Sequence, residues 1–117
     1  MYHSYGQDSL EVSSNAKSAA VVLRLGREVG LDKKQEVQVY DIMQERWSGL
    51  AKLKTTQVSI TRESIDDQTV ADLKKVLTES QFSKFLELRL ERRKHKKEFM
   101  SKNPGYRFSE VDKDLDF

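Results

Sequence analysis

The sequence predicts an all-α fold of about four helices, arranged as a thin curved helical layer or a hairpin-like bundle that a second copy completes. Its 117 residues include one proline and five glycines, too few for the turns of an all-β protein. Apolar residues recur at spacings of three and four, the period of an amphipathic helix. Hydrophobic residues make up 37% of the chain and charged residues 34%. This composition leaves little apolar surface for a thick core and favours a thin layer or a dimer.

A first helix is expected over residues 16–29, with Ser14 or Asn15 as its N-cap, because a short oxygen-bearing side chain can accept a bond from a first-turn amide. Gly30 suits the left-handed position that ends a helix. The next helix starts almost at once, so the two form a hairpin or a sharp elbow. The inward stripe of the first helix is predicted to be Ala16, Ala19, Ala20 and Leu23.

A second helix is expected over residues 33–54, because its larger side chains are spaced three, four and three. Residues 55–61 carry β-branched and hydroxyl side chains without such a stripe, which predicts a frayed end or a loop. A third helix is expected to begin at Ser64, Asp66 or Asp67. The inward residues of these two helices are predicted to be Tyr40, Met43, Trp47, Leu50, Val70, Leu73 and Val76.

A fourth helix is expected after Leu77-Thr78, with a polar part over residues 91–98 that projects beyond the bundle. The turn signal at residues 103–105, Asn-Pro-Gly, ends it. The predicted organisation is a flexible N-terminal arm at 1–13, one helical domain at 14–102 and a loose acidic tail at 103–117. No apolar run is long enough for a transmembrane helix.

Two similar pentapeptides are the most specific signal in the sequence: LDKKQ at residues 31–35 and LTESQ at residues 77–81. Each has the pattern of a capping box. Its second residue accepts from the backbone amide three positions on, and the glutamine reaches back to the amide of the cap. We therefore assign a structural role in capping helices to Asp32, Gln35, Thr78 and Gln81.

These pentapeptides resemble the two LTxxQ motifs of the Spy/CpxP family of small helical periplasmic proteins. LTESQ matches the motif in full, whereas LDKKQ has Asp32 where the family has threonine. The resemblance covers roughly residues 28–93. It implies a thin, curved helical layer, often dimeric, whose concave face holds non-native protein without ATP. It also implies a periplasmic or otherwise extracytoplasmic address and a removed signal peptide, although the sequence itself leaves a cytoplasmic location open.

Catalytic chemistry has little support, and the chain is not expected to be an enzyme. It has no glycine-rich phosphate loop and no nucleophile motif. It has no cysteine, and its two histidines are His3 and His95. Some relatives in the family bind zinc, but these histidines lie in the arm and in a run of charges, so no metal site and no cofactor are predicted.

A basic run follows the second motif: residues 82–102 hold eight Lys or Arg and three acidic residues. Cations beside exposed apolar side chains suit a surface that holds unfolded protein, since apolar contact gives affinity and charge speeds encounter. The candidate client-binding residues are Arg46, Trp47, Arg89, Leu90, Arg93 and Met100.

Two alternatives to a holding chaperone or envelope-stress binding protein remain open. The chain could be a helical scaffold or regulator with one specific protein partner. It could also be a nucleic-acid-associated protein that uses the run at 89–97, since each phosphate neutralised by Lys or Arg releases counterions. No recognised nucleic-acid-binding motif accompanies this run, so nucleic acid has the least support among the three classes of partner.

Overall fold

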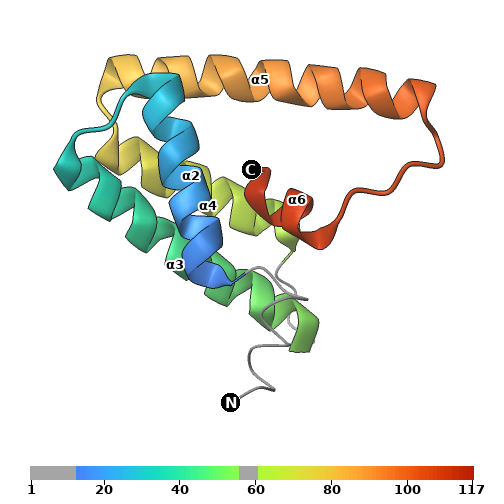
Figure 1. Cartoon of the computed structure of the whole chain (residues 1–117), viewed down its shortest axis with the longest axis horizontal. Coiled ribbons are helices and arrows are strands. Elements are labelled where there is room, and N and C mark those ends of the chain that lie inside the picture. Colours follow the sequence, from blue (N-terminus) through green and yellow to red (C-terminus); the bar gives the residue numbers. More distant parts are fainter. Residues whose placement is uncertain (1–12, 56–60) are drawn as a thin grey trace.

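The computed structural model describes residues 13–55 and 61–117 and builds them almost entirely from helices (Figure 1). The described residues contain no strand, so the all-α prediction is confirmed. Nearly all of the predicted N-terminal arm lies outside the described residues, as does most of the expected loop at 55–61. The helices are α2 (Ser14–Val29), α3 (Lys33–Thr55), α4 (Arg62–Val76), α5 (Glu79–Lys102) and α6 (Glu110–Leu115).

Helices α2 and α3 form the expected hairpin, turning at Gly30 with φ 75°. A left-handed backbone of this kind favours glycine, which has no Cβ to clash. The N-caps differ from those predicted. Ser13, not Ser14 or Asn15, accepts from the amide of Ala16 at 3.1 Å. Thr61, not a residue of 64–67, caps α4 by a capping box with Ser64.

The buried face of α2 is the main error in the predicted helices. Its buried residues are Ser18, Val21 and Leu25, whereas the predicted stripe is exposed, including Leu23 at 63%. The prediction was wrong because alanine is small and occurs on either the buried or the exposed face of a helix. Ser18 is buried because α3 supplies partners: its hydroxyl donates to Gln44 Oε1 at 2.5 Å and accepts from Trp47 Nε1 at 2.8 Å.

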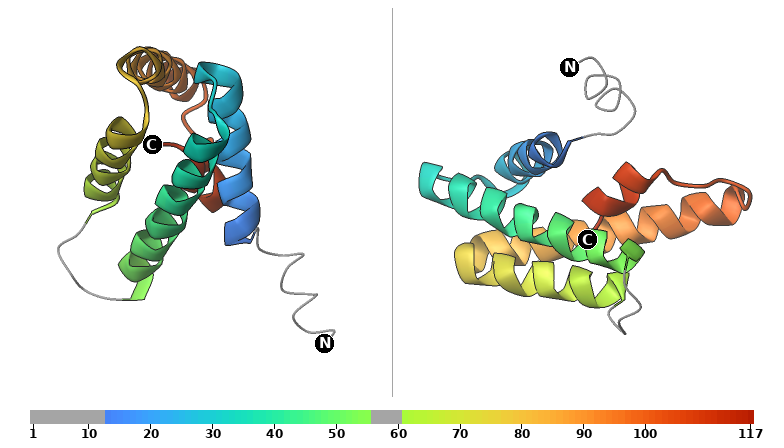
Figure 2. Two further views of the ribbon diagram at one scale, coloured as in Figure 1. Left: turned by 90° about the vertical axis from the view of Figure 1, so that its left-hand side faces the viewer. Right: turned by 90° about the horizontal axis from the view of Figure 1, so that it is seen from below.

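The core lies where α3 packs between α2 and α4, with α5 crossing against both outer helices (Figures 1 and 2). On α3, Met43, Trp47 and Leu50 are buried as predicted, Val39 is buried beside them, and Tyr40 is half-buried. On α4, Leu73 is fully buried as predicted, and Ile65 joins it. The remaining buried apolar side chains of the core are Val21, Leu25, Met43, Trp47, Leu50, Leu77, Phe85 and Phe117.

The two predicted capping boxes are present and contact each other. Asp32 accepts from the Gln35 amide at 2.7 Å, and Thr78 accepts from the Gln81 amide at 3.2 Å. The two glutamine side chains then exchange hydrogen bonds: Gln35 Nε2 donates to Gln81 Oε1 at 2.7 Å, and Gln81 Nε2 donates to Gln35 Oε1 at 3.1 Å. Gln81 Nε2 also donates to the Gly30 carbonyl.

This glutamine pair joins the start of α5 to the α2–α3 turn. Gln35 is buried, and its Nε2 also donates to the Val76 carbonyl at the end of α4 at 3.2 Å. Polar groups that leave water are stable only when their hydrogen bonds are satisfied. Here two helix starts and two helix ends satisfy one another, so the repeated motif fixes how the two helical hairpins meet.

Candidate functional site

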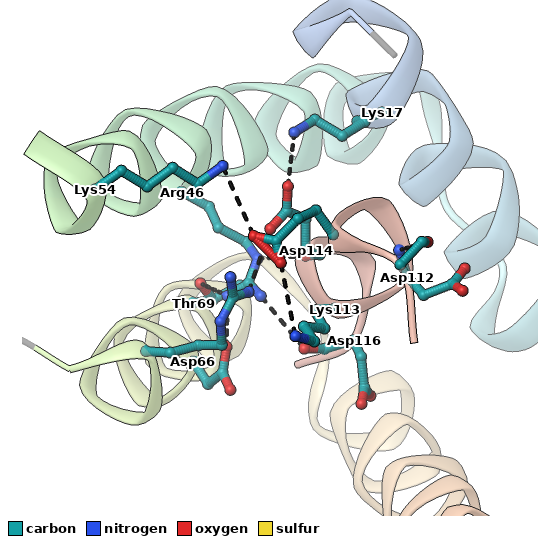
Figure 3. Close-up of polar contacts among 12 residues, drawn as sticks. Lys17, Arg46, Lys54, Asp66, Thr69, Asp112, Lys113, Asp114 and Asp116 are labelled. Carbon is teal, nitrogen blue, oxygen red and sulfur yellow. Dashed lines mark hydrogen bonds and ion pairs between the residues drawn. The ribbon is translucent and has the colours of Figure 1, made fainter. Parts of the chain in front are cut away.

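The C-terminal segment folds back below α5 (Figure 1). Arg46 of α3 contacts it there (Figure 3). Arg46 is 3% exposed. Its Nε donates to the Asp114 carbonyl at 2.9 Å and its Nη2 to the Asp116 carbonyl at 3.3 Å. Its Nη1 donates to Asp66 Oδ1 at 2.8 Å and to Thr69 Oγ1 at 3.2 Å, both on α4. One guanidinium thus ties α3 to α4 and to α6. Burial lowers the pKa of Arg46, while the bond to Asp66 opposes that shift.

Further ion pairs surround the same segment. The buried carboxylate of Asp114 bridges Lys17 Nζ at 2.9 Å and Arg62 Nη1 at 3.2 Å, joining α2 to α4. Asp116 pairs with Lys96 Nζ of α5 at 2.9 Å. The side chains of Asp114 and Asp116 therefore pair with cations from three different helices, α2, α4 and α5, which a loose tail would leave unpaired.

Phe117 completes the docking as an apolar anchor. It is 1% exposed, and its ring lies 6.1 Å from that of Phe85, centroid to centroid. The guanidinium carbons of Arg46 and Arg24 lie 4.9 Å and 5.1 Å from the same ring centroid, within the range of cation–π attraction. The expectation of a loose tail at residues 103–117 is wrong for this reason: the segment carries a large aromatic side chain that the core accepts.

Two of the predicted client-binding residues, Arg46 and Trp47, are placed inside the molecule. Trp47 is 6% exposed, and Lys17 Nζ lies 4.6 Å from its ring centroid. Arg46 is covered by the docked segment. Neither is accessible to a client in this structure, which corrects the prediction. Their positions on the amphipathic face of α3 gave the same periodic signal that a binding face would give.

The other four predicted residues lie together on α5. Leu90 is 71% exposed and Met100 42% exposed, Arg93 is exposed and Arg89 is half-buried. Burial lowers the pKa of Arg89, and the nearby positive charge of Arg93 lowers it further. With steps of four, three, four and three, one face of the helix presents five exposed side chains, which we call the α5 stripe: Leu86, Leu90, Arg93, Lys97 and Met100.

A second exposed apolar area, which was not predicted from the sequence, lies on the α2–α3 hairpin. Leu23 is 63% exposed and Val37 62% exposed. Both line a shallow groove of about 480 Å³ together with Val22 and Tyr40. Leu23 was predicted to be in the core. Placing Val21 and Leu25 on the buried face of α2 would have predicted that Leu23 is exposed.

In the part of the chain that the structure describes, no three His, Cys, Asp or Glu side chains come together as metal ligands. None of the described helices combines the length and apolarity needed to cross a bilayer.

Comparisons with known proteins returned no matching family model, no matching curated protein and no matching solved structure.

Proposed function

We propose that this chain is an LTxxQ-type helical protein of the cell envelope that holds non-native polypeptide on the α5 stripe. The pentapeptides support the family and the location. The contact between Gln35 and Gln81 supports a shared structural role for the two motifs. The activity is carried by one observation: Leu90, exposed by 71%, lies one turn from Leu86 and next to Arg93 in the stripe.

Physical chemistry connects this stripe to non-native protein. An unfolded chain exposes apolar side chains that Leu86, Leu90 and Met100 can cover, and burial of apolar area is favourable at about 25 cal/mol per Å². Three separated apolar side chains provide weak, generic contact. Arg93 and Lys97 lie between them and keep the bound complex in contact with water. The stripe thus suits reversible holding of many clients.

The test is light scattering from a chemically denatured model client diluted into buffer with and without this protein, free of ATP. The wild-type chain is expected to suppress aggregation at a near-equal molar ratio, and Leu90→Ser to suppress it less. Leu23→Ser is the matched control, because it makes the same chemical change at a comparably exposed site on α2. Circular dichroism confirms that each variant is folded.

Equal suppression by wild type and Leu90→Ser would contradict the role of the stripe. If folded wild-type protein gave no suppression at all, the general holding function would be wrong. A helical scaffold with one specific protein partner would then be the better account. Binding to nucleic acid that weakens steeply with salt, and less steeply in a variant neutralised over 92–97, would favour the third class instead.

The resemblance also leads us to propose a homodimer, which sedimentation velocity on the same samples tests. A mass of two chains is expected for the wild type. A single chain at concentrations that suppress aggregation would show that the α5 stripe acts without a partner copy.

A further inference from the structure

A pocket of about 660 Å³ lies between α2, the distal half of α5 and the returning segment. Figure 1 shows α2 and α6 below α5, with residues 103–109 running down one side. The volume falls in the range of pockets that bind small molecules. This pocket is separate from the α5 stripe: no stripe residue lines it.

Two arginines of the pocket wall, Arg24 on α2 and Arg92 on α5, have hydrogen-bond donors without acceptors. Each uses Nη1: that of Arg24 donates to the Leu115 carbonyl at 2.9 Å, and that of Arg92 to Glu28 Oε2 at 3.5 Å. In both residues Nε and Nη2 are buried and have no hydrogen-bond partner among the described residues. These two atoms form the edge of a guanidinium that binds a carboxylate by two parallel hydrogen bonds.

Among the half-buried charged residues that line the pocket, cations outnumber acids by one. Arg24, Arg92 and Lys96 are half-buried cations, whereas Glu28 and Asp116 are the half-buried acids. Glu91 and Asp112 are exposed, so water screens them more strongly. Burial lowers the pKa of Arg24, and the nearby charge of Arg92 lowers it further. An anion held between the two guanidinium groups would relieve that repulsion.

The rest of the pocket is an aromatic wall. The rings of Phe99, Tyr106 and Phe108 contact one another, with centroids 4.9–6.2 Å apart. Leu88 and Leu115 add aliphatic surface. Phe99 is 41% exposed and Tyr106 47% exposed, so the cluster presents area that a ligand can cover. The arginine side and the aromatic side of the pocket together suit an amphipathic ligand.

We propose that this pocket binds a small organic monoanion, a carboxylate joined to an aromatic or alkyl body. The carboxylate binds the free edges of Arg24 and Arg92, which reach it by rotation of guanidinium groups that already line the pocket. The apolar body packs on the aromatic cluster. Because residues 106–116 form one side of the pocket, such a ligand also fastens the C-terminal segment to α5.

Isothermal titration calorimetry with 4-phenylbutyrate tests the site. We expect saturable binding of one ligand per chain. The neutral 4-phenylbutanol and the cationic 4-phenylbutylamine carry the same body and are expected to bind at least about tenfold more weakly, since neither can form the charge-assisted hydrogen bonds of a carboxylate. The phosphate monoester of 4-phenylbutanol should also bind more weakly, because Glu28 repels its second charge.

Arg92→Gln removes one of the two edges and is expected to weaken 4-phenylbutyrate binding about tenfold or more. The matched control is Arg93→Gln, the same change at the adjacent exposed residue outside the pocket, with an expected effect below about twofold. If Arg92→Gln lost its helical circular dichroism, Arg92→Lys would replace it, since lysine keeps the charge but lacks the two-pronged edge. Its binding is expected to be weakened as well.

Four results would overturn the proposal. The first is equal affinity for 4-phenylbutyrate and 4-phenylbutanol, which would show that the site does not select an anion. The second is equal affinity of Arg92→Gln and Arg93→Gln for 4-phenylbutyrate, which would show that the ligand does not bind in this pocket. The third is tighter binding of the phosphate monoester, which would make the ligand a dianion. Absence of saturation up to about 10 mM would also overturn the proposal, whatever the result of the aggregation assay.

Discussion

Replacing Arg46 with methionine removes a buried group that contacts both α4 and the C-terminal segment from α3. Methionine keeps the unbranched apolar stem and has no donor. The change deletes four hydrogen bonds, to the carbonyls of Asp114 and Asp116 and to the side chains of Asp66 and Thr69. It also removes the cation that lies 4.9 Å from the ring centroid of Phe117.

The loss of stability is expected to be about 3 kcal/mol, the lower end of the range for breaking a buried ion pair. The lower end applies because the side chain of Asp66 is 14% exposed and can regain water. The backbone carbonyls of Asp114 and Asp116 can also regain hydrogen bonds to water if α6 leaves its site. Against a total stability of about 5–15 kcal/mol, the melting temperature should fall by roughly 10 °C.

Urea titration followed by circular dichroism and by Trp47 fluorescence measures this effect. Trp47 is buried beside Arg46, so its emission also reports whether the docked segment has left. Arg93→Met, at an exposed position, is the control and should change stability by less than about 0.5 kcal/mol. A loss below about 1 kcal/mol for Arg46→Met, with unchanged emission, would refute the view that Arg46 organises this junction.

Four further substitutions, used in three experiments, test the helix caps and the packing. Thr78→Ala should cost about 1 kcal/mol in urea titration through the lost N-cap; a value near zero would contradict the cap. Gln35→Ala and Gln81→Ala should show a coupling energy of at least about 0.5 kcal/mol in a double-mutant cycle; simple additivity would mean that the two motifs do not stabilise each other. Leu73→Ala should cost about 2–5 kcal/mol by thermal melting, and an unchanged melting temperature would show that α4 is not part of the core.

Local signals in the sequence identified most of the helices. The spacing of Met43, Trp47 and Leu50 identified the buried face of α3, because these large side chains leave one favourable orientation. On α2, small alanines and branched residues spread around the helix and leave the orientation open. The orientation of α2 depends instead on the buried Ser18. Its hydroxyl bonds to Gln44 and Trp47, which only the folded chain brings near it.

The docked C-terminal segment could not be predicted in the same way. Its helix α6 has six residues, too few for a periodic signal, and its alternating acidic and apolar residues resemble a solvated tail. What holds it is a set of long-range partners, among them Lys17 and Arg46. Ser109, which caps α6 by accepting from the Asp112 amide, was the one local sign of order.

The contact between the two capping boxes was also beyond local reasoning. Each motif indicated its own helix start, but nothing in either pentapeptide required Gln35 to meet Gln81. Their pairing depends on the turn at Gly30 and on the end of α4, which place the two amides in hydrogen-bond reach. The sequence therefore predicted the bonds of Gln35 and Gln81 within each capping box. It did not predict their bonds to each other and to the ends of α2 and α4.

The most direct test of the proposed function is the accessibility of the α5 stripe with a client bound. The chain has no cysteine, so Leu90→Cys introduces a single reactive thiol, and Asp41→Cys places a control thiol at an exposed position of α3. Alkylation rates are measured with and without a denatured client at saturating concentration. The account predicts slower alkylation at position 90 and an unchanged rate at position 41. Equal rates at position 90 with and without a bound client would contradict it.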